Sequence, residues 1–237
     1  MKILKSILLA SVIMIISLST STAKNNELFS KNYKVKSFSS VKANTFADIV
    51  YTQSDEVVVK AVGEQNLVDN LKITVNKGVL TIENDKKLNN RNDVPVVIFL
   101  SSPTITSIET HGMGNWCLKG KVKTDNLEIK CKGIGSLRAL DLQSEKVCVK
   151  YDGIGDLSLG GITNLVEITA DGVGNVDCRN LLAKTAMVKS TKTGKVNCFA
   201  SECIGLFNDG VGDITYHGNP TVKNLQNVGM GLIKEGM

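Results

Sequence analysis

Residues 152–159, Asp152-Gly153-Ile154-Gly155-Asp156-Leu157-Ser158-Leu159, carry the pattern that decides the fold. A Gly-hydrophobic-Gly triplet is followed by a stretch in which apolar and polar residues alternate. The triplet recurs at Gly112–Gly114, Gly133–Gly135, Gly172–Gly174, Gly210–Gly212 and Gly229–Gly231, with a degenerate copy at Lys192–Gly194. Consecutive second glycines are 18 to 21 residues apart, so the chain contains an internal repeat of about twenty residues.

The residues two and four positions after the second glycine are apolar in most copies. In the quoted copy they are Leu157 and Leu159, with polar Ser158 between them. This period of two is typical of a half-buried strand. Apolar residues also stand six and eight positions before the second glycine, as Val149 and Val147 do here. Each copy therefore predicts a strand, a corner and a second strand, with these positions facing the core.

A unit of this size with one apolar face cannot bury that face alone, so the copies must stack. We expect an all-β, single-stranded, right-handed parallel β-helix-like solenoid, in which equivalent positions lie about 4.8 Å apart. Residues 106–237 would supply about seven coils. Glycine is expected at the corners because a sharp turn needs positive φ, or brings backbones too close for a Cβ. Lys192 departs from this pattern and predicts a locally altered turn.

Residues 24–105 fit the repeat less well but are rich in β patterns. We interpret them as atypical capping coils that are continuous with the solenoid in one domain. The local signals are a hairpin turn at 76–78, a degenerate corner with a strand at 46–51, a helical turn at 67–71, a polar loop at 86–93 and a buried strand at 94–100.

The first 23 residues have the features of a secretory signal peptide. Lys2 and Lys5 precede the apolar run Ile7 to Leu18, and Ser21-Thr22-Ala23 offers small residues for cleavage. The apolar run is shorter than the roughly 20 residues of a spanning helix, and no other segment comes close to that length. We expect an exported protein without a transmembrane segment, in the periplasm, at the outer membrane or on the cell surface.

The composition excludes several classes of protein. The chain has 237 residues, of which 42% are hydrophobic and 22% charged. This describes an ordinary foldable chain and excludes a disordered, a collagen-like or a coiled-coil protein. Aromatic residues reach only 5%, so the core must be built from aliphatic side chains. The formal net charge is +5, and the basic residues are spread along the chain. Nucleic acid is therefore not an expected partner.

Three elements together resemble a known family. They are the Gly-hydrophobic-Gly corners followed by Asp, Asn or Ser, the pattern Asn-Leu-x-x-x-Leu-x-Ile-x-Val at 66–75, and Gly-x-Leu-x-Ile at 78–82. They are similar to the putative auto-transporter adhesin, head GIN domain family, over nearly all of the mature chain. The resemblance implies an exported bacterial domain similar to pectin-lyase-type β-helices, without recognised catalytic residues, and with a role in cell adhesion.

Acidic residues flank three corners and form the main candidate site. They are Asp152, Asp156, Asp171, Asp209 and Asp213. Hard cations such as Ca²⁺ prefer such oxygens. A calcium-binding β-roll, however, repeats about every nine residues, and Asp is favoured in turns because its side chain bonds nearby backbone N–H groups. We expect turn formation, with a metal site as the alternative, and no cofactor.

Two enzyme signatures are weak in this sequence. A polysaccharide lyase or hydrolase uses two or three carboxylates set apart for catalysis, whereas the acidic residues here recur in phase with the repeat. His111 and His217 occupy unrelated phases of the repeat. We therefore expect no catalytic residues, and a carbohydrate-active β-helix enzyme is the alternative.

Aromatic and cysteine side chains also fall mostly on core positions. Trp116, Tyr151 and Tyr216 stand at inward phases, which leaves Tyr33 and Tyr51 as candidate exposed rings for sugar binding. Cys131, Cys178 and Cys198 also point inward, whereas Cys117 and Cys148 point outward on different strands. This scatter favours core filling over a disulfide framework. Cys178 and Cys198 share a phase and are 20 residues apart, so we expect them to be neighbours on adjacent coils.

The expected function is a non-catalytic, exported binding or adhesive module for a surface ligand, either protein or glycan. The alternatives are the carbohydrate-active enzyme and an envelope scaffold. The last corner is followed by six residues, and Glu235 stands at an inward phase. Uncapped coils leave unpaired backbone groups, so this edge favours either a charged monomer end or a homo-oligomer that forms through it.

Overall fold

The computed structural model describes residues 28–85, 96–191 and 194–236. The expected signal peptide, the polar loop at 86–93 and Lys192 lie outside these ranges. The N-terminal elements are β1 (Phe29–Asn32), β2 (Ser40–Asn44), β3 (Asp48–Gln53), β4 (Val58–Gly63), α2 (Gln65–Asp69), β5 (Leu71–Asn76), β6 (Val79–Asn84) and β7 (Val97–Ser102). The strands of the repeat are β8 (Ser107–Thr110), β9 (Trp116–Leu118), β10 (Val122–Lys123), β11 (Asn126–Cys131), β12 (Leu137–Tyr151), β13 (Leu157–Ala170), β14 (Val176–Ser190), β15 (Val196–Phe199), β16 (Cys203–Asn208), β17 (Ile214–His217), β18 (Val222–Asn227) and β19 (Ile233–Glu235).

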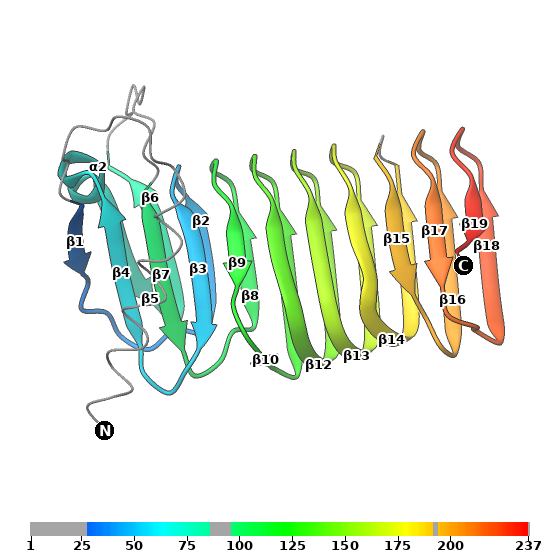
Figure 1. Ribbon diagram of the computed structural model, residues 1–237, viewed down its shortest axis with the longest axis horizontal. Coiled ribbons are helices and arrows are strands. Elements are labelled where there is room, and N and C mark those ends of the chain that lie inside the picture. The colour runs from blue at the N-terminus through cyan, green and yellow to red at the C-terminus, as the bar shows by residue number, and fades with distance from the viewer. Residues whose placement is uncertain (1–27, 86–95, 192–193, 237) are drawn as a thin grey trace.

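Each coil crosses two sheets that meet at a Gly-hydrophobic-Gly corner (Figure 1). The entry sheet holds the strands that lead into the corners, namely β8, β11, the second halves of β12 to β14, β16 and β18. The exit sheet holds the strands that leave them, namely β9, the first halves of β12 to β14, β15, β17 and β19. Both sheets are parallel through these coils, with Val149 paired to Ile168 and Leu137 to Leu157. The solenoid continues for about six turns, which confirms the predicted fold class.

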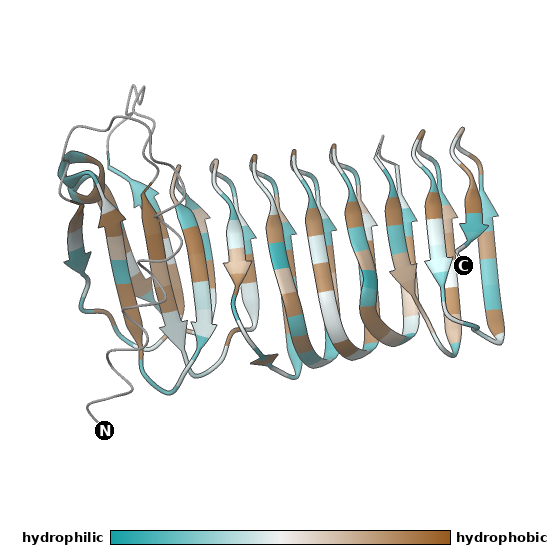
Figure 2. Ribbon diagram, in the orientation of Figure 1, coloured by the Kyte–Doolittle hydropathy of each residue, from teal (hydrophilic) through white to brown (hydrophobic). Residues whose placement is uncertain are grey.

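The core lies between the two sheets and is built from the predicted inward positions. Leu157, Leu159, Val147 and Val149 are all buried, and Figure 2 shows apolar and polar positions alternating along the strands. Aliphatic side chains from successive coils stack on one another, so each coil covers the apolar face of the next. Trp116 is also buried, as predicted.

The tyrosines and cysteines follow the predicted phases with one exception. Tyr51, expected as a candidate exposed ring, is fully buried, because its strand β3 is covered by β7 on one side and β9 on the other. Tyr33 is half-buried and donates its hydroxyl to the Val68 carbonyl over 2.9 Å. Cys131 and Cys198 are buried, and burial raises the pKa of the Cys198 thiol to about 12. Such a thiol behaves as a small apolar side chain.

The corners bring backbone against backbone. Gly174 has φ +122°, and a Cβ on it would lie 1.7 Å from the carbonyl oxygen of Gly155 in the preceding coil. Both reasons that predicted glycine, positive φ and close approach, therefore hold at this corner. From the core side, Asn208 donates its Nδ2 group to the Gly212 carbonyl over 3.2 Å, and Asn227 bonds Gly231 in the same way.

The column extends into the N-terminal segment in an order that differs from the chain order. Strands β2 and β3, with Phe46 at their corner, form a coil that pairs in parallel with β8 and β9. Strands β6 and β7 form the next coil outward, parallel to β2 and β3. Antiparallel β5, β4 and β1 then close this end. The division of the chain at residue 105 stays a prediction, since the ladder runs across it.

Three local predictions for the N-terminal segment can be compared with the structure. The degenerate corner at 46–51 is present. The helical turn expected at 67–71 is α2, which lies two residues earlier, at Gln65–Asp69, because Leu71 begins strand β5. The hairpin turn has Lys77 at φ 48° and Gly78 at φ 77°, as a tight turn between antiparallel strands requires. The strand expected at 94–100 is displaced toward the C-terminus and runs over Val97–Ser102.

The opposite end of the column carries a polar cluster in place of core residues. Leu225 and Lys223 stand six and eight positions before Gly231, at phases that face inward in the earlier coils. Both are exposed because no further coil of the described residues covers them. Glu235 accepts a hydrogen bond from the Tyr216 hydroxyl over 2.9 Å and one from Lys223 over 3.3 Å. Lys223 and Glu235, the two charged residues that break the apolar pattern, thus pair with each other beside the buried ring of Tyr216.

We expect Gly174→Ala to lower the free energy of unfolding by about 3 kcal/mol or more, because the new methyl group collides with a backbone oxygen. Gly120→Ala is the matched control, since Gly120 also has positive φ, +75°, but open space around it. Its cost should be the conformational strain alone, about 1–2 kcal/mol. Thermal and urea unfolding measure both, and equal losses would contradict the stacked-corner geometry.

We expect a fall in pH to destabilise the C-terminal coil, formed by β18 and β19, before it destabilises the rest of the solenoid. The Tyr216 hydroxyl and Lys223 lower the pKa of Glu235, and the backbone N–H of Leu232 and the Lys234 ammonium lower the pKa of Asp213. A carboxylate with a lowered folded-state pKa stabilises the fold above its unfolded pKa, and that contribution disappears as the pH falls through the folded value. Hydrogen exchange of β18 and β19, corrected for intrinsic rates, should therefore accelerate below about pH 4. Unchanged protection at pH 3, or the same acceleration in Glu235→Gln, would oppose this.

Candidate functional site

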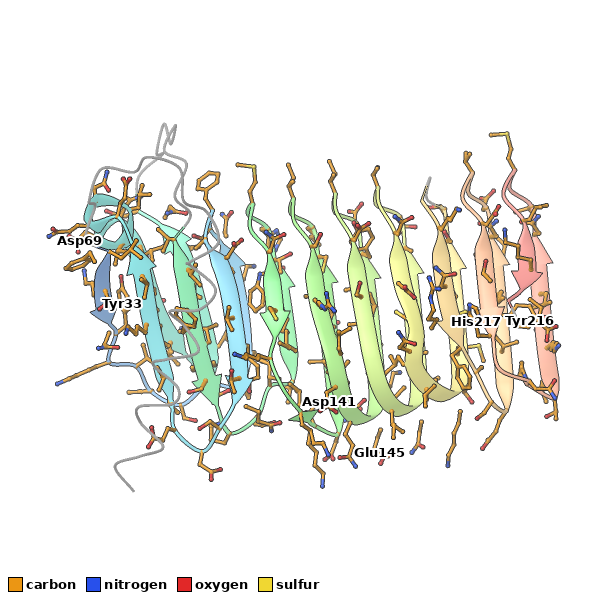
Figure 3. The ribbon with its side chains drawn as sticks, viewed as in Figure 1. Tyr33, Asp69, Asp141, Glu145, Tyr216 and His217 are labelled. Carbon is orange, nitrogen blue, oxygen red and sulfur yellow. The ribbon has the colours of Figure 1, made fainter. Side chains whose placement is uncertain are left out.

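The middle residues of the corners form an exposed apolar row along one edge of the solenoid, which we call the corner ridge. Figure 3 shows side chains projecting from the row of corners at the upper edge. The exposed fraction rises from 44% at Phe46 to 80% at Met230. The described members of the ridge are Phe46, Met113, Ile134, Ile154, Val173, Val211 and Met230.

At the centre of the ridge, the backbone groups of Ile134, Ile154 and Val173 are all engaged with neighbouring coils. The N–H of Ile154 donates to Gly133 over 3.0 Å, and its carbonyl accepts from Gly135 over 2.8 Å. Isolated parallel bridges link Met113, Ile134, Ile154 and Val173 in turn. No backbone group of Ile154 is left for a partner strand, so the centre of the ridge can make contacts only through its side chains.

Sequence reasoning noted the hydrophobic residue between the glycines but assigned it no direction. The direction could have been predicted from whether a residue stands an even or an odd number of positions from the second glycine. Positions at even distances from the second glycine face inward, as Leu157 and Val149 do, and the middle residue stands at an odd distance. Parity therefore predicts that Ile154 points outward, as the structure shows.

The five predicted acidic residues border the ridge in two rows. Asp152, Asp171 and Asp209 precede the first glycine, and Asp156 and Asp213 follow the second. The structure does not gather them into one site, because each row places its members in different coils, some of them two or three coils apart. Among the described residues, no group of three or more His, Cys, Asp or Glu side chains could hold a metal ion.

The row after the second glycine forms a hydrogen-bonded ladder between coils. Asp156 Oδ1 accepts the backbone N–H of Asn175 over 2.8 Å, and Asn175 Oδ1 accepts that of Lys195 over 3.2 Å. The Ser136 hydroxyl oxygen accepts the backbone N–H of Asp156 in the same way, over 3.1 Å. Asp, Asn and Ser are thus placed after the second glycine because each can accept the N–H of the next coil.

The ladder continues at the last corner, where Asp213 accepts the Leu232 N–H over 3.0 Å and pairs with Lys234 over 2.7 Å. In the other row, Asp171 accepts the Thr191 hydroxyl over 2.6 Å. These acids therefore act structurally, and they also give the ridge an acidic border in its C-terminal half.

The two histidines lie apart from these acids. His111 is hydrogen-bonded to Glu109 over 2.5 Å, and this bond lowers the pKa of the Glu109 carboxyl. His217 lies at the end of β17, next to Tyr216 (Figure 3), and its buried Nε2 atom has no partner among the described residues. Among the described residues, Glu109 is the only acidic side chain that pairs with either histidine.

A second surface feature lies on the outer face of the entry sheet. It is a hollow of about 400 Å³ over β13, β14, β16 and β18, which we call the entry-face hollow. Its lining includes Phe207, Lys189 and one carboxylate, Glu167. Glu167 is paired with Lys146 over 2.8 Å and accepts the Cys148 thiol over 3.0 Å.

The sequence profile of the putative auto-transporter adhesin, head GIN domain family matches residues 37–220. The chain belongs to this family. The match spans the capping coils and most of the ridge, which confirms the resemblance seen in the corner pattern. Within the described ranges, no helix has the length and apolar composition needed to cross a membrane.

Solved structures show the same architecture as this member of the head GIN domain family. A putative adhesin from Bacteroides fragilis is 34% identical, with a TM-score of 0.87 over 90% of this chain and 98% of that one. A putative lipid binding protein from Parabacteroides distasonis, 19% identical, has a TM-score of 0.67 over the same shares of the two chains. At that identity the likeness concerns the fold alone. No curated protein matches the chain.

Calcium is expected to leave the melting temperature unchanged, because Asp156 and Asp213 already accept backbone hydrogen bonds. A cation that bound only the folded state would raise the melting temperature by mass action. Thermal unfolding in millimolar calcium and in EDTA makes the comparison. A rise of several degrees that is lost in Asp152→Asn/Asp156→Asn would instead establish a metal site at the corners.

Proposed function

We propose that this chain is a non-catalytic, exported module for adhesion or binding, at the cell surface or in the periplasm, and that the corner ridge is its contact surface. The observation that carries the proposal is the ridge itself, an exposed apolar position repeated at seven described corners, while the degenerate corner has Thr193 at this place in the sequence. Soluble proteins rarely expose contiguous apolar surface without a partner for it. Family membership and the adhesin name of the Bacteroides relative support the same role.

The chemistry of the ridge favours a protein as its partner. Its backbone is engaged, so the partner must offer an apolar strip in place of a strand edge. The border contains Asp152, Asp156, Asp171, Asp209 and Asp213 against the two lysines Lys132 and Lys195. This excess of negative charge disfavours an anionic lipid surface and favours a partner with basic groups beside its apolar strip. A protein surface with an apolar strip between basic residues meets both conditions.

The alternatives use other parts of the molecule. A glycan-cleaving enzyme needs a second carboxylate near the first, whereas the entry-face hollow offers Glu167, already paired with Lys146. An envelope scaffold would use the ridge without an external ligand. The outer edges of β18 and β19, unpaired within the described residues, support self-association as a further part of the proposal.

Beads coated with the purified protein test the ridge directly. The variant Ile134→Ser/Ile154→Ser/Val173→Ser removes three half-exposed aliphatic side chains, each worth about 1 kcal/mol in a contact. Bead retention on intact bacterial and epithelial cells should therefore fall more than about tenfold. Fluorescence microscopy counts the beads, and anionic lipid vesicles serve as a second target that should retain none.

The matched control removes the same amount of exposed apolar surface from the opposite edge, where Figure 3 labels Asp141 and Glu145. It is Leu140→Ser/Ile162→Ser/Leu182→Ser, whose three residues are 44–63% exposed. The control should retain wild-type adhesion. Equal losses in both variants would remove the ridge from the proposal, and wild-type beads that bind neither cells nor vesicles would defeat the adhesive function.

A further inference from the structure

The entry-face hollow exists because one outward position lacks a side chain. Gly205 pairs with Met187 on one side and Asn224 on the other, in a row of outward-facing residues. A Cβ on Gly205 would lie 2.5 Å from the Met187 sulfur, so the methionine leans over the vacant position. The next outward residue on the same strand is Phe207, whose half-buried ring forms a wall of the hollow.

The groups around the ring are polar. Lys189 Nζ lies over the Phe207 ring, 5.7 Å from its centre, in a cation–π contact, and no carboxylate among the described residues pairs with it. Asn224 and Gln226 are exposed on β18, and within the described part of the chain their side-chain amides have no hydrogen-bond partner. An aromatic face, an ammonium group and two amides therefore converge on one concave surface.

These groups form a row parallel to the axis of the solenoid. The register pairs Thr169 with Lys189, Lys189 with Phe207 and Phe207 with Gln226. Neighbours in such a row are about 4.8 Å apart, so a linear ligand along the axis meets one of them at each coil. On the N-terminal side the row continues to Lys150, a second ammonium group two coils from Lys189.

We propose that the entry-face hollow binds an acidic glycan, with a sugar ring stacked on Phe207 and a carboxylate of the glycan on Lys189. A pyranose ring offers an apolar face of C–H groups to an aromatic ring, and its hydroxyls both donate and accept, as amides do. Asn224 and Gln226 bond these hydroxyls. Glu167 is held by Lys146, so the site binds the glycan without cleaving it.

The site is separate from the corner ridge and goes beyond the proposed adhesive contact. It was not visible in the repeat pattern, because the repeat prescribes only an outward direction at the positions of Gly205 and Phe207. Equivalent outward positions in earlier coils hold Lys150 and Thr169, or Glu167 and Met187. On strand β16, the consecutive outward positions are a glycine, Gly205, and an aromatic residue, Phe207. This combination places the site at β16.

Calorimetric titration with three hexamers tests the proposal: hexagalacturonate as an acidic glycan, cellohexaose as a neutral glycan and hexaglutamate as an acidic peptide. The wild type should bind hexagalacturonate and discriminate against the other two. Phe207→Ala should weaken that binding about tenfold or more, and Gly205→Gln should do the same by filling the hollow. Lys189→Gln should remove the preference for the acidic glycan.

Phe199→Ala, which removes a half-buried ring from the exit sheet, and the ridge variant should both bind hexagalacturonate as the wild type does. If Phe207→Ala unfolds, Phe207→Trp keeps a stacking face and should keep binding. In NMR spectra, hexagalacturonate should shift the side-chain amide signals of Asn224 and Gln226. No binding at millimolar hexagalacturonate, equal binding of hexaglutamate, or shifts confined to other residues would each overturn the proposal.

Discussion

Backbone contact between successive corners is the constraint on which the rest of the structure depends. A Cβ on Gly174 would lie 1.7 Å from the Gly155 carbonyl oxygen, and the other corner glycines of the described coils meet their predecessors in the same way. No side chain fits there, so the corners can stack only in one register. That register fixes the parallel pairing of both sheets and delivers each inward residue onto its equivalent one coil earlier.

The same constraint determines what the ridge residue can do. At Ile134, Ile154 and Val173 the N–H and carbonyl are used by neighbouring corners, and the side chain has only one direction available, away from the protein. A preference for extended backbone accounts for Ile154 and Val173 at this position. It does not account for Met113 and Met230, which are not β-branched. Apolar character, and not strand propensity alone, is therefore what the described corners share, and this is the behaviour of a contact surface.

Much of the fold could be predicted because its signals are periodic. The spacing of Gly155 and Gly174 gave the coil, and alternation around them gave the core. The role of Asp156 was predicted only in part. Aspartate in a turn was expected to bond its own turn, whereas it bonds Asn175, 19 residues away. That bond exists only once the coils are in register, so no local pattern indicates it.

Features that depend on non-periodic arrangement could not be predicted. Tyr51 is buried because the coil of β6 and β7 lies outside the coil of β2 and β3, although it comes later in the chain. A repeat pattern alone implies that the coils stack in the order in which they follow one another along the chain. The entry-face hollow depends on Gly205, which lacks a side chain at a position where the repeat prescribes only an outward direction.

The two surfaces differ in what repetition can supply. The ridge repeats one contact at each of its seven described members, so several weak contacts act together on an extended partner, and effective concentration raises the total affinity. Loss of one member, such as Ile154, leaves the others in place. The hollow occurs where the repeat is interrupted, and its chemistry is concentrated in Phe207 and Lys189. A solenoid of this kind can therefore gain strength from its regular positions and selectivity from its irregular ones, and substitutions at the two kinds of position should affect different ligands.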